Sequence, residues 1–340
     1  MHLTQKKRQW LYALQRPWPL EQYPLKTLAE QLQTTVAELS DFVVWLREQG
    51  IVRRIGAVFD ARRLGYRSCL FALRASEPFL TLAAQRVCAH SGVTHAYVRG
   101  WPQDVRLNGV QASDYAAYPN LWYTLSARSE RFEQEAAQLA DLCPRAFPAI
   151  ARYKIDVVFD ERTRGRDERT EYTTAAPENR SDEPEVIRAT SEERAFVRRY
   201  QDDTTTPETP FLGEDLPILR AWQKKGIMRR FALLLRHRKV GFMANGMCCW
   251  RVSQESRDDL GRRLAAEPEV THCYARPSVP EFPFNLYAMV HKTSWEAGMD
   301  VFQRLSQVVG VSETSGRIFF STHEYKKSSM RFFVERECEL

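Results

Sequence analysis

An internal repeat constrains the fold of this chain more than any other feature. The segment "GIVRRIGAVFDARRLGY" at 50–66 returns as "GIMRRFALLLRHRKVGF" at 226–242. Further on, "VTHAYVRG" at 93–100 returns as "VTHCYARP" at 270–277, and "NLWYTLSA" at 120–127 returns as "NLYAMVHK" at 285–292. Three blocks in the same order indicate a duplication. We therefore expect both halves to carry the same order of helices and strands.

Each half predicts a winged helix–turn–helix followed by a βαββαβ domain. In the first half, 26–32 and 35–48 have helical spacing, Gly50 ends the second helix, and the segment after it alternates as an extended wing. Strands are then expected at 68–74, 93–99, 120–126 and 152–159, with helices at 79–90 and 129–142. The second half predicts strands at 244–252, 270–276, 284–291 and 317–322, with helices at 254–266 and 295–308. The fold class is thus α+β, a tandem duplication with a ferredoxin-like domain in each half.

The domain boundaries follow from the repeat and from one charged segment. The first half is expected at 1–162, with its helix–turn–helix at about 8–60 and its βαββαβ domain at about 66–160. Residues 163–187 are almost free of aliphatic side chains, which predicts a linker. The second half is expected at 188–340, with a degenerate helix–turn–helix at about 190–235 and a βαββαβ domain at about 240–335.

Composition narrows the class of protein. No run approaches the roughly 18 apolar residues that a membrane-spanning helix needs, and the N-terminus lacks the apolar core of a signal peptide. The seven cysteines include no C-x-x-C pair, so neither a disulfide framework nor a metal site is expected. We therefore expect a soluble, cytoplasmic protein without a membrane partner. The net charge of +6 makes an anionic partner plausible.

The helix–turn–helix is poorly suited to DNA. The expected recognition helix of the first half carries Glu38, Asp41 and Glu48 against Arg47 alone, and such a helix repels a phosphate backbone. In the second half, prolines at 207, 210 and 217 and an acidic pair at 214–215 occupy the corresponding segment. We expect no DNA binding, although a DNA-binding regulator stays as the alternative suggested by the fold.

A long basic segment predicts the ligand. From Leu216 to Gln254 there is no Asp or Glu, while nine Arg and Lys residues and His237 are interleaved with apolar side chains. Arginine binds carboxylates at two points, so this composition favours a flat, apolar partner rimmed by carboxylates, such as a polycarboxylate macrocycle. The halves also diverge here: "DARR" at 60–63 becomes "RHRK" at 236–239, and Ser126 becomes His291. The second half is therefore expected to hold the working site.

The motifs "GIxRRxxxxLRHRKxGFxANGMxxW", "VxHCYxRP", "FNLYxMxH" and a terminal "HEYKKxxxRFF" resemble those of the siroheme decarboxylases, which are Lrp/AsnC-like proteins. The resemblance covers nearly the whole chain, which looks like a fusion of the two related subunits. It implies a carboxy-lyase that removes the carboxyl groups of two acetate side chains of siroheme. The implied product is 12,18-didecarboxysiroheme, for the biosynthesis of heme d1 or heme b. No cofactor is implied beyond the iron of the siroheme substrate.

Decarboxylation needs an acid and cations that hold the other carboxylates. The candidate catalytic residues are His237, His291 and His272, although the last lies in a strand shared by both halves and a structural role is an open alternative. The candidate substrate-binding residues are Arg229, Arg230, Arg236, Arg238, Lys239, His323, Tyr325, Lys326 and Lys327. A heme-binding sensor is a further alternative. The two fused copies are expected to form an internal pseudo-dimer, and a homo-oligomer is compatible with it.

Overall fold

The structure is a computed structural model that describes residues 3–107, 109–155, 158, 184–310 and 315–334. Residues 163–183 of the predicted linker lie outside the described residues. The same holds for residues 156, 157 and 159 of the strand predicted at 152–159. Within the described ranges, none of the helices combines the length and the apolar composition that a bilayer crossing requires.

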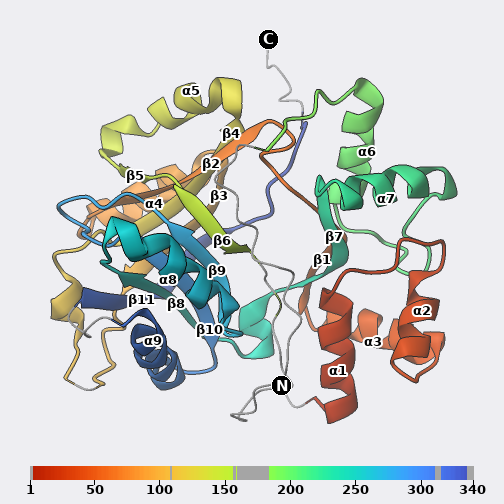
Figure 1. Cartoon of the computed structure of the whole chain (residues 1–340), viewed down its shortest axis with the longest axis horizontal. Coiled ribbons are helices and arrows are strands. Elements are labelled where there is room, and N and C mark those ends of the chain that lie inside the picture. Colours follow the sequence, from red (N-terminus) through yellow and green to blue (C-terminus); the bar gives the residue numbers. More distant parts are fainter. Residues whose placement is uncertain (1–2, 108, 156–157, 159–183, 311–314, 335–340) are drawn as a thin grey trace.

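The helices of both helix–turn–helix segments gather in one lobe, which we call the helical lobe (Figure 1). It holds α1 (Gln5–Gln15), α2 (Pro24–Gln31) and α3 (Val36–Glu48) of the first half, and α6 (Ser191–Gln201) and α7 (Leu216–Lys224) of the second half. The helices predicted at 26–32 and 35–48 are confirmed as α2 and α3. Thr35 and Glu38 form a capping box at the start of α3, and Gly50 follows that helix at a φ of 63°, which L side chains rarely adopt.

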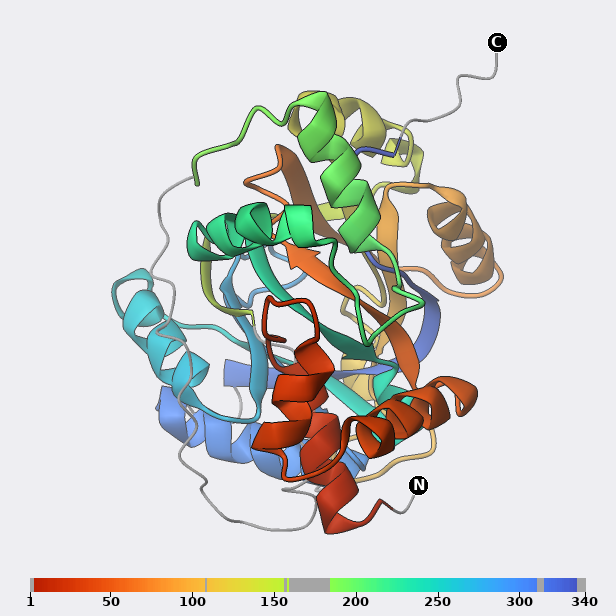
Figure 2. The same cartoon turned by 90° about the vertical axis from the view of Figure 1, so that its right-hand side faces the viewer.

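The two wings pair with each other. β1 (Val52–Phe59) and β7 (Met228–Leu235) form an antiparallel ribbon with Gly56 opposite Ala232. Figure 2 faces this lobe and shows helices of both halves in front of the ribbon. Their apolar side chains form one core, in which Phe231 packs edge-on against Trp18, and Phe59 packs against Trp222. The helical lobe therefore belongs to both halves of the sequence at once.

The other lobe, the sheet lobe, is built by the two βαββαβ segments. Within the described residues its strands form a nine-stranded sheet in the order β5-β2-β4-β3-β11-β8-β10-β9-β6. The strands are β2 (Tyr66–Leu73), β3 (Val93–Gly100), β4 (Leu121–Arg128), β5 (Arg145–Phe147), β6 (Ala151–Ile155), β8 (Ala244–Trp250), β9 (Val270–Ala275), β10 (Leu286–Lys292) and β11 (Gly316–Lys327). The helices α4 (Phe79–Ala89), α5 (Phe132–Ala137), α8 (Gln254–Ala266) and α9 (Trp295–Val309) lie on its outer side (Figure 1). The predicted α+β class and element order are confirmed, although α5 is shorter than the helix expected at 129–142.

The last strand of each half pairs with the other half. β11 pairs with β8 of its own half and also with β3, so that Glu324 lies opposite Tyr97 and Lys327 opposite His95. β6 leaves the first half and pairs with β9, where Arg152 lies opposite Tyr274. The register therefore makes "ARYKI" at 151–155 the counterpart of "HEYKK" at 323–327. The sequence had suggested that the strand at 317–322 is the counterpart of the strand at 152–159, and the structure corrects this. The correct alignment follows from pairing between the two halves, which the sequence pattern does not show.

Candidate active site

A cavity of about 530 Å³ lies between the β1–β7 ribbon and the nine-stranded sheet. Its volume is within the range of ligand pockets. Seven cationic side chains line it, and among the described residues that line it there is no Asp or Glu. They are Arg53, Arg54, Arg99, Arg152, Arg230, Arg276 and Lys327, accompanied by His95, His272 and His291. The wall thus has the composition expected of a site for a polyanion.

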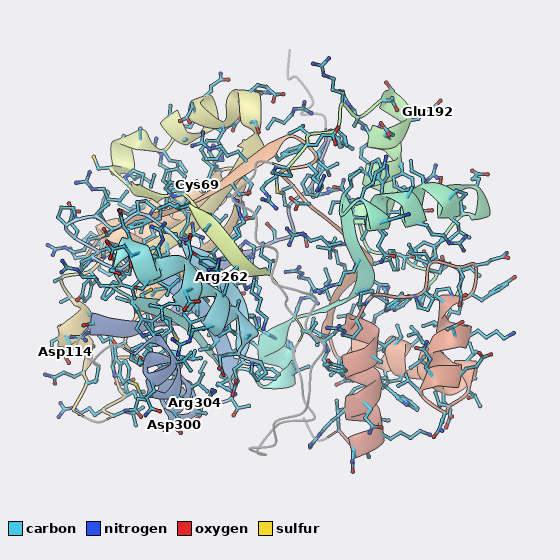
Figure 3. The ribbon with its side chains drawn as sticks, viewed as in Figure 1. Cys69, Asp114, Glu192, Arg262, Asp300 and Arg304 are labelled. Atoms are coloured by element: carbon cyan, nitrogen blue, oxygen red, sulfur yellow. The ribbon has the colours of Figure 1, made fainter. Side chains whose placement is uncertain are left out.

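Several of these arginines lack a protein partner for their charge. For Arg53, Arg99 and Arg276, no carboxylate within the described ranges lies at ion-pair distance. Buried N–H groups of Arg53, Arg54 and Arg99 likewise have no hydrogen-bond partner among the residues that the structure describes. In contrast, Arg304 on the outer helix α9, which is labelled in Figure 3, has carboxylate partners. It pairs with Glu267 at 2.9 Å and with Glu269 at 2.6 Å. Because a buried donor without an acceptor is costly, the cavity arginines fit an anionic ligand.

The duplication places the same three residue types at both ends of the cavity. β3 presents His95, Tyr97 and Arg99, and β9 presents the equivalent residues at 272, 274 and 276. Their spacing of two residues puts all three side chains on one face of each strand. The Arg99 guanidinium lies 5.0 Å from the centre of the Tyr97 ring, and the equivalent distance in β9 is 4.9 Å. These two triads form a pseudo-symmetric frame.

A second group of side chains breaks this symmetry. The Nζ atom of Lys327 lies 2.6 Å from Nδ1 of His237, and the His237 ring centre lies 5.2 Å from that of His291. The duplication and the strand register give their counterparts as Ala61, Ser126 and Ile155, which carry no basic group. The group of His237, His291 and Lys327, which we call the proton-transfer cluster, therefore occurs once and is not duplicated.

Burial and neighbouring cations keep the histidines of the free protein neutral. Burial, then Lys327 and Arg238, lowers the pKa of His237 to about 3. Burial, then His237 and Lys327, lowers the pKa of His291, while burial lowers the pKa of Lys327 to about 8. A bound carboxylate favours the protonated form of a nearby base. An anionic ligand would therefore raise these pKa values and charge the imidazoles.

The structure brings together only part of the predicted site. Arg230, His272, His291 and Lys327 line the cavity, and His237 contacts two of them. The other predicted substrate-binding residues do not line it: they are Arg229, Arg236, Arg238, Lys239, His323, Tyr325 and Lys326.

The local backbone explains why these residues point elsewhere. The chain after β7 forms a short 3₁₀ helix at 237–240, which sends successive side chains around its axis and leaves Lys239 exposed. Arg236 turns back and donates hydrogen bonds to the carbonyl oxygens of residues 50 and 52. Arg229 pairs with Asp60 at 3.0 Å. Lys326 donates hydrogen bonds to the carbonyl oxygens of residues 88 and 90 at the end of α4, because alternation along β11 points it away from the cavity.

Sequence reasoning missed several arginines of the cavity wall. Arg99 and Arg276 could have been found from the sequence. Each follows the histidine of the shared "VTH" at an even spacing, and side chains at even spacing lie on the same face of a strand. Arg53 and Arg54 were not among the predicted substrate-binding residues, although their counterparts Arg229 and Arg230 were. No local signal marks Arg152, because its place depends on the pairing of β6 with β9.

Comparisons with known proteins identify the family of the chain. Residues 239–326 match the model of the AsnC-like ligand binding domain. The chain is 29% identical to the siroheme decarboxylase of Hydrogenobacter thermophilus, over 96% of this chain and 94% of that protein. It is 38% identical to the siroheme decarboxylase beta subunit of Methanosarcina barkeri, over 40% of this chain and 95% of that subunit. The crystal structure of the siroheme decarboxylase NirDL in co-complex with an iron-uroporphyrin III analogue matches with a TM-score of 0.64 and 25% identity, over 97% of this chain and 95% of that chain. This chain belongs to the siroheme decarboxylase family.

Proposed function

We propose that the cavity binds siroheme and that the chain removes the carboxyl groups of two of its acetate side chains, giving 12,18-didecarboxysiroheme. One observation carries this proposal: a cavity between two lobes is lined by six arginines, a lysine and three histidines. Siroheme is a flat macrocycle whose rim carries many carboxylates, and arginines bind such groups at two points. Family membership supplies the reaction class.

In the proposed mechanism, the arginines hold the carboxylates that stay, so that one acetate is presented to the proton-transfer cluster. The bond between its methylene and carboxylate carbons breaks, carbon dioxide leaves, and the electron pair stays on the methylene carbon, where the macrocycle delocalises it. A proton then reaches that carbon and completes a methyl group. His237 or His291 would donate this proton, with Lys327 resupplying His237 through their 2.6 Å contact.

His237 suits this role because its pKa responds to the ligand. In the free protein its pKa is about 3, and carboxylates entering the cavity would raise it towards neutrality, where a general acid works best. His272 and His95 lie on the shared frame, which favours holding the substrate over donating the proton. No cofactor beyond the iron of siroheme enters this scheme.

We propose further that the two halves act as an internal pseudo-dimer in the cytoplasm, without DNA. Arg47, the basic residue of the expected recognition helix, donates hydrogen bonds of 2.8 and 3.0 Å to the carboxylate of Asp203. α3 packs its Leu39, Phe42, Val43 and Leu46 into the helical lobe, so the helix serves as part of the cavity's support. The product would feed the biosynthesis of heme d1 or of heme b, and homo-oligomers of the chain are compatible with the scheme.

The test is anaerobic incubation of the purified protein with siroheme, followed by mass spectrometry of the extracted tetrapyrrole. Loss of two carbon dioxide units is expected, and His237→Ala should slow it while Lys239→Gln, a change of an exposed cation on the same 3₁₀ helix, should not. Tight binding with unchanged mass would favour a heme sensor. If the protein neither binds siroheme nor changes its mass, the result would favour the DNA-binding regulator.

A further inference from the structure

The motif "VTH", which both halves share at 93–95 and 270–272, contains a threonine that the proposed mechanism does not use. In β9 the register against β10 shifts by one residue at this motif, and Thr271 is the extra residue. Such an extra residue is a β-bulge, which re-aims a side chain. Neighbours in a regular strand face opposite sides of the sheet, yet here the buried Thr271 hydroxyl contacts the ring of His272.

The Thr271 hydroxyl lies within hydrogen-bond distance of three groups. It donates to the carbonyl oxygen of Met289 at 3.1 Å. Its oxygen also lies 3.3 Å from Nδ1 of His291 and 3.3 Å from Nδ1 of His272. A hydroxyl has one proton to donate and two lone pairs that accept. Since its proton goes to the carbonyl oxygen, both imidazoles must donate to it, and these three bonds fill the capacity of the hydroxyl.

These contacts fix where the imidazole protons lie. The hydrogen bond made by one ring nitrogen decides which of the two nitrogens carries the proton. Burial and nearby cations lower the pKa of His291, so the ring is neutral in the free protein. His291 therefore carries its proton on Nδ1 and its lone pair on Nε2. Because Thr271 holds Nδ1, Nε2 is the atom that can take up and give away a proton at the cavity wall.

The first half contains the same bulge without the second histidine. Thr94 is the extra residue of β3, and its hydroxyl lies 2.9 Å from Nδ1 of His95 and donates to the carbonyl oxygen of Thr124 at 3.5 Å. The counterpart of His291 is Ser126, whose hydroxyl bonds to another serine at 2.7 Å. The contact between the threonine and a frame histidine is thus duplicated, whereas the contact to the proton-transfer cluster is not.

We propose that Thr271 is a positioning residue: it holds Nδ1 of His291 and so makes Nε2 the atom that donates the proton to the substrate. This inference rests on the proposed function, since it takes His291 to be the acid. The carboxylates of the bound substrate favour the charged imidazole, so Nε2 takes up a proton from water. The Thr271 oxygen stabilises this imidazolium by accepting a charge-assisted hydrogen bond from Nδ1–H.

The proton balance follows from this arrangement. The bond between the methylene and carboxylate carbons of the acetate breaks, and carbon dioxide leaves without the electron pair. That pair takes the Nε2 proton and becomes the new C–H bond of the methyl group. His291 returns to the neutral form with its proton on Nδ1, the same form as before the step. The ring is therefore ready for the second acetate without rotating or exchanging its tautomer.

The first test measures the tautomer in the ligand-free protein and does not depend on turnover. In protein labelled with ¹⁵N-histidine, a ring nitrogen that carries a proton and one that does not have different NMR chemical shifts. The signals of His291 are those that disappear in His291→Ala. The wild type should show a protonated Nδ1 and an unprotonated Nε2, and Thr271→Val should shift His291 towards the opposite tautomer. The opposite tautomer in the wild type, or an unchanged tautomer in Thr271→Val, would overturn the proposal.

Kinetics separate positioning from support of the fold. Thr271→Val keeps the shape of the side chain and removes the hydroxyl, so kcat should fall about 10- to 100-fold while KM for siroheme changes only a few-fold. Thr271→Ser restores the hydroxyl and should recover most of that loss. The matched variant Thr94→Val removes the equivalent hydroxyl beside a frame histidine, so its main effect should be on KM. Equal falls of kcat in the two valine variants, or no recovery in the serine variant, would contradict the positioning role.

The outcomes distinguish this inference from the proposed function. Circular dichroism checks that Thr271→Val folds, and the spectrum of the wild type tests the tautomer even if it does not. A wild type with the expected tautomer that leaves siroheme intact would end the decarboxylase and keep the assignment of the His291 tautomer. Decarboxylation by a wild type with the opposite tautomer would end the role of Thr271 alone.

Discussion

The buried His237 should make the free protein less stable at mildly acidic pH. Only 2% of its surface is exposed, and its pKa falls from 6.5 to about 3, first because of burial and then because of Lys327, Arg238 and Arg53. The unfolded chain binds a proton near pH 6.5, whereas the folded chain does so only near pH 3. This contribution to stability is therefore fully present above pH 6.5 and is lost as the pH falls towards 3.

The magnitude follows from the width of that window. Lowering the pH to about 5 crosses roughly 1.5 pH units of it, and at about 1.36 kcal/mol per unit the folded state loses about 2 kcal/mol. Urea unfolding of the wild type and of His237→Gln at about pH 7.5 and about pH 5 measures this loss. The wild type should lose about 2 kcal/mol more than the variant between these conditions.

A matched control is His323→Gln, because His323 is exposed. This variant should lose as much unfolding free energy between the two pH values as the wild type does. Equal losses in the wild type and in His237→Gln would show that the imidazole is not held neutral, and the argument for a ligand-driven rise of its pKa would fail. A loss shared by the His323 variant and the wild type, but absent from His237→Gln, supports it.

Three further predictions concern the ligand. His291→Ala should lower the decarboxylation rate by about 10²- to 10⁴-fold, as expected for loss of a general acid. Ser126→Ala, at the counterpart position, should change the rate only a few-fold. Mass spectrometry of the product measures both rates. Arg276→Gln should weaken siroheme binding about 10- to 100-fold in an absorbance titration, because a charge-assisted hydrogen bond contributes roughly 1.5–3 kcal/mol, whereas Arg304→Gln on α9 should leave the affinity unchanged. Siroheme at about 100 times its Kd should stabilise the fold by about 2.7 kcal/mol, seen as a rise in Tm, and no rise would contradict binding in the cavity.

The sequence was sufficient for the local elements of the fold. Helical spacing, the Thr35 cap and Gly50 define α3 within one chain segment, and alternation defines β3 and β9 in the same way. Such signals depend on neighbours in sequence, so a single sequence contains them. The duplication then gave the βαββαβ order of both halves.

The sequence was not sufficient for contacts between the halves. Arg152 reaches the cavity only because β6 crosses to β9, and Lys327 reaches it because β11 pairs with β3. Both pairings join residues far apart in the chain, and no local pattern encodes them. The basic run at 236–239 was misleading for a related reason: a cluster of charges in sequence becomes a cluster in space only if the backbone points the side chains the same way, and a 3₁₀ helix does not.

The differences between the two copies separate holding the substrate from transforming it. The frame residues are duplicated: His95, Tyr97 and Arg99 have equivalents of the same type in β9, because carboxylates all round a macrocycle need cations at both ends of the cavity. The proton-transfer cluster is not duplicated, since a proton is delivered to one carbon at a time. Two identical sets of basic side chains in one small cavity would also repel each other in a medium of low dielectric. A fused chain can lose one set while keeping both frames, which two identical subunits cannot do.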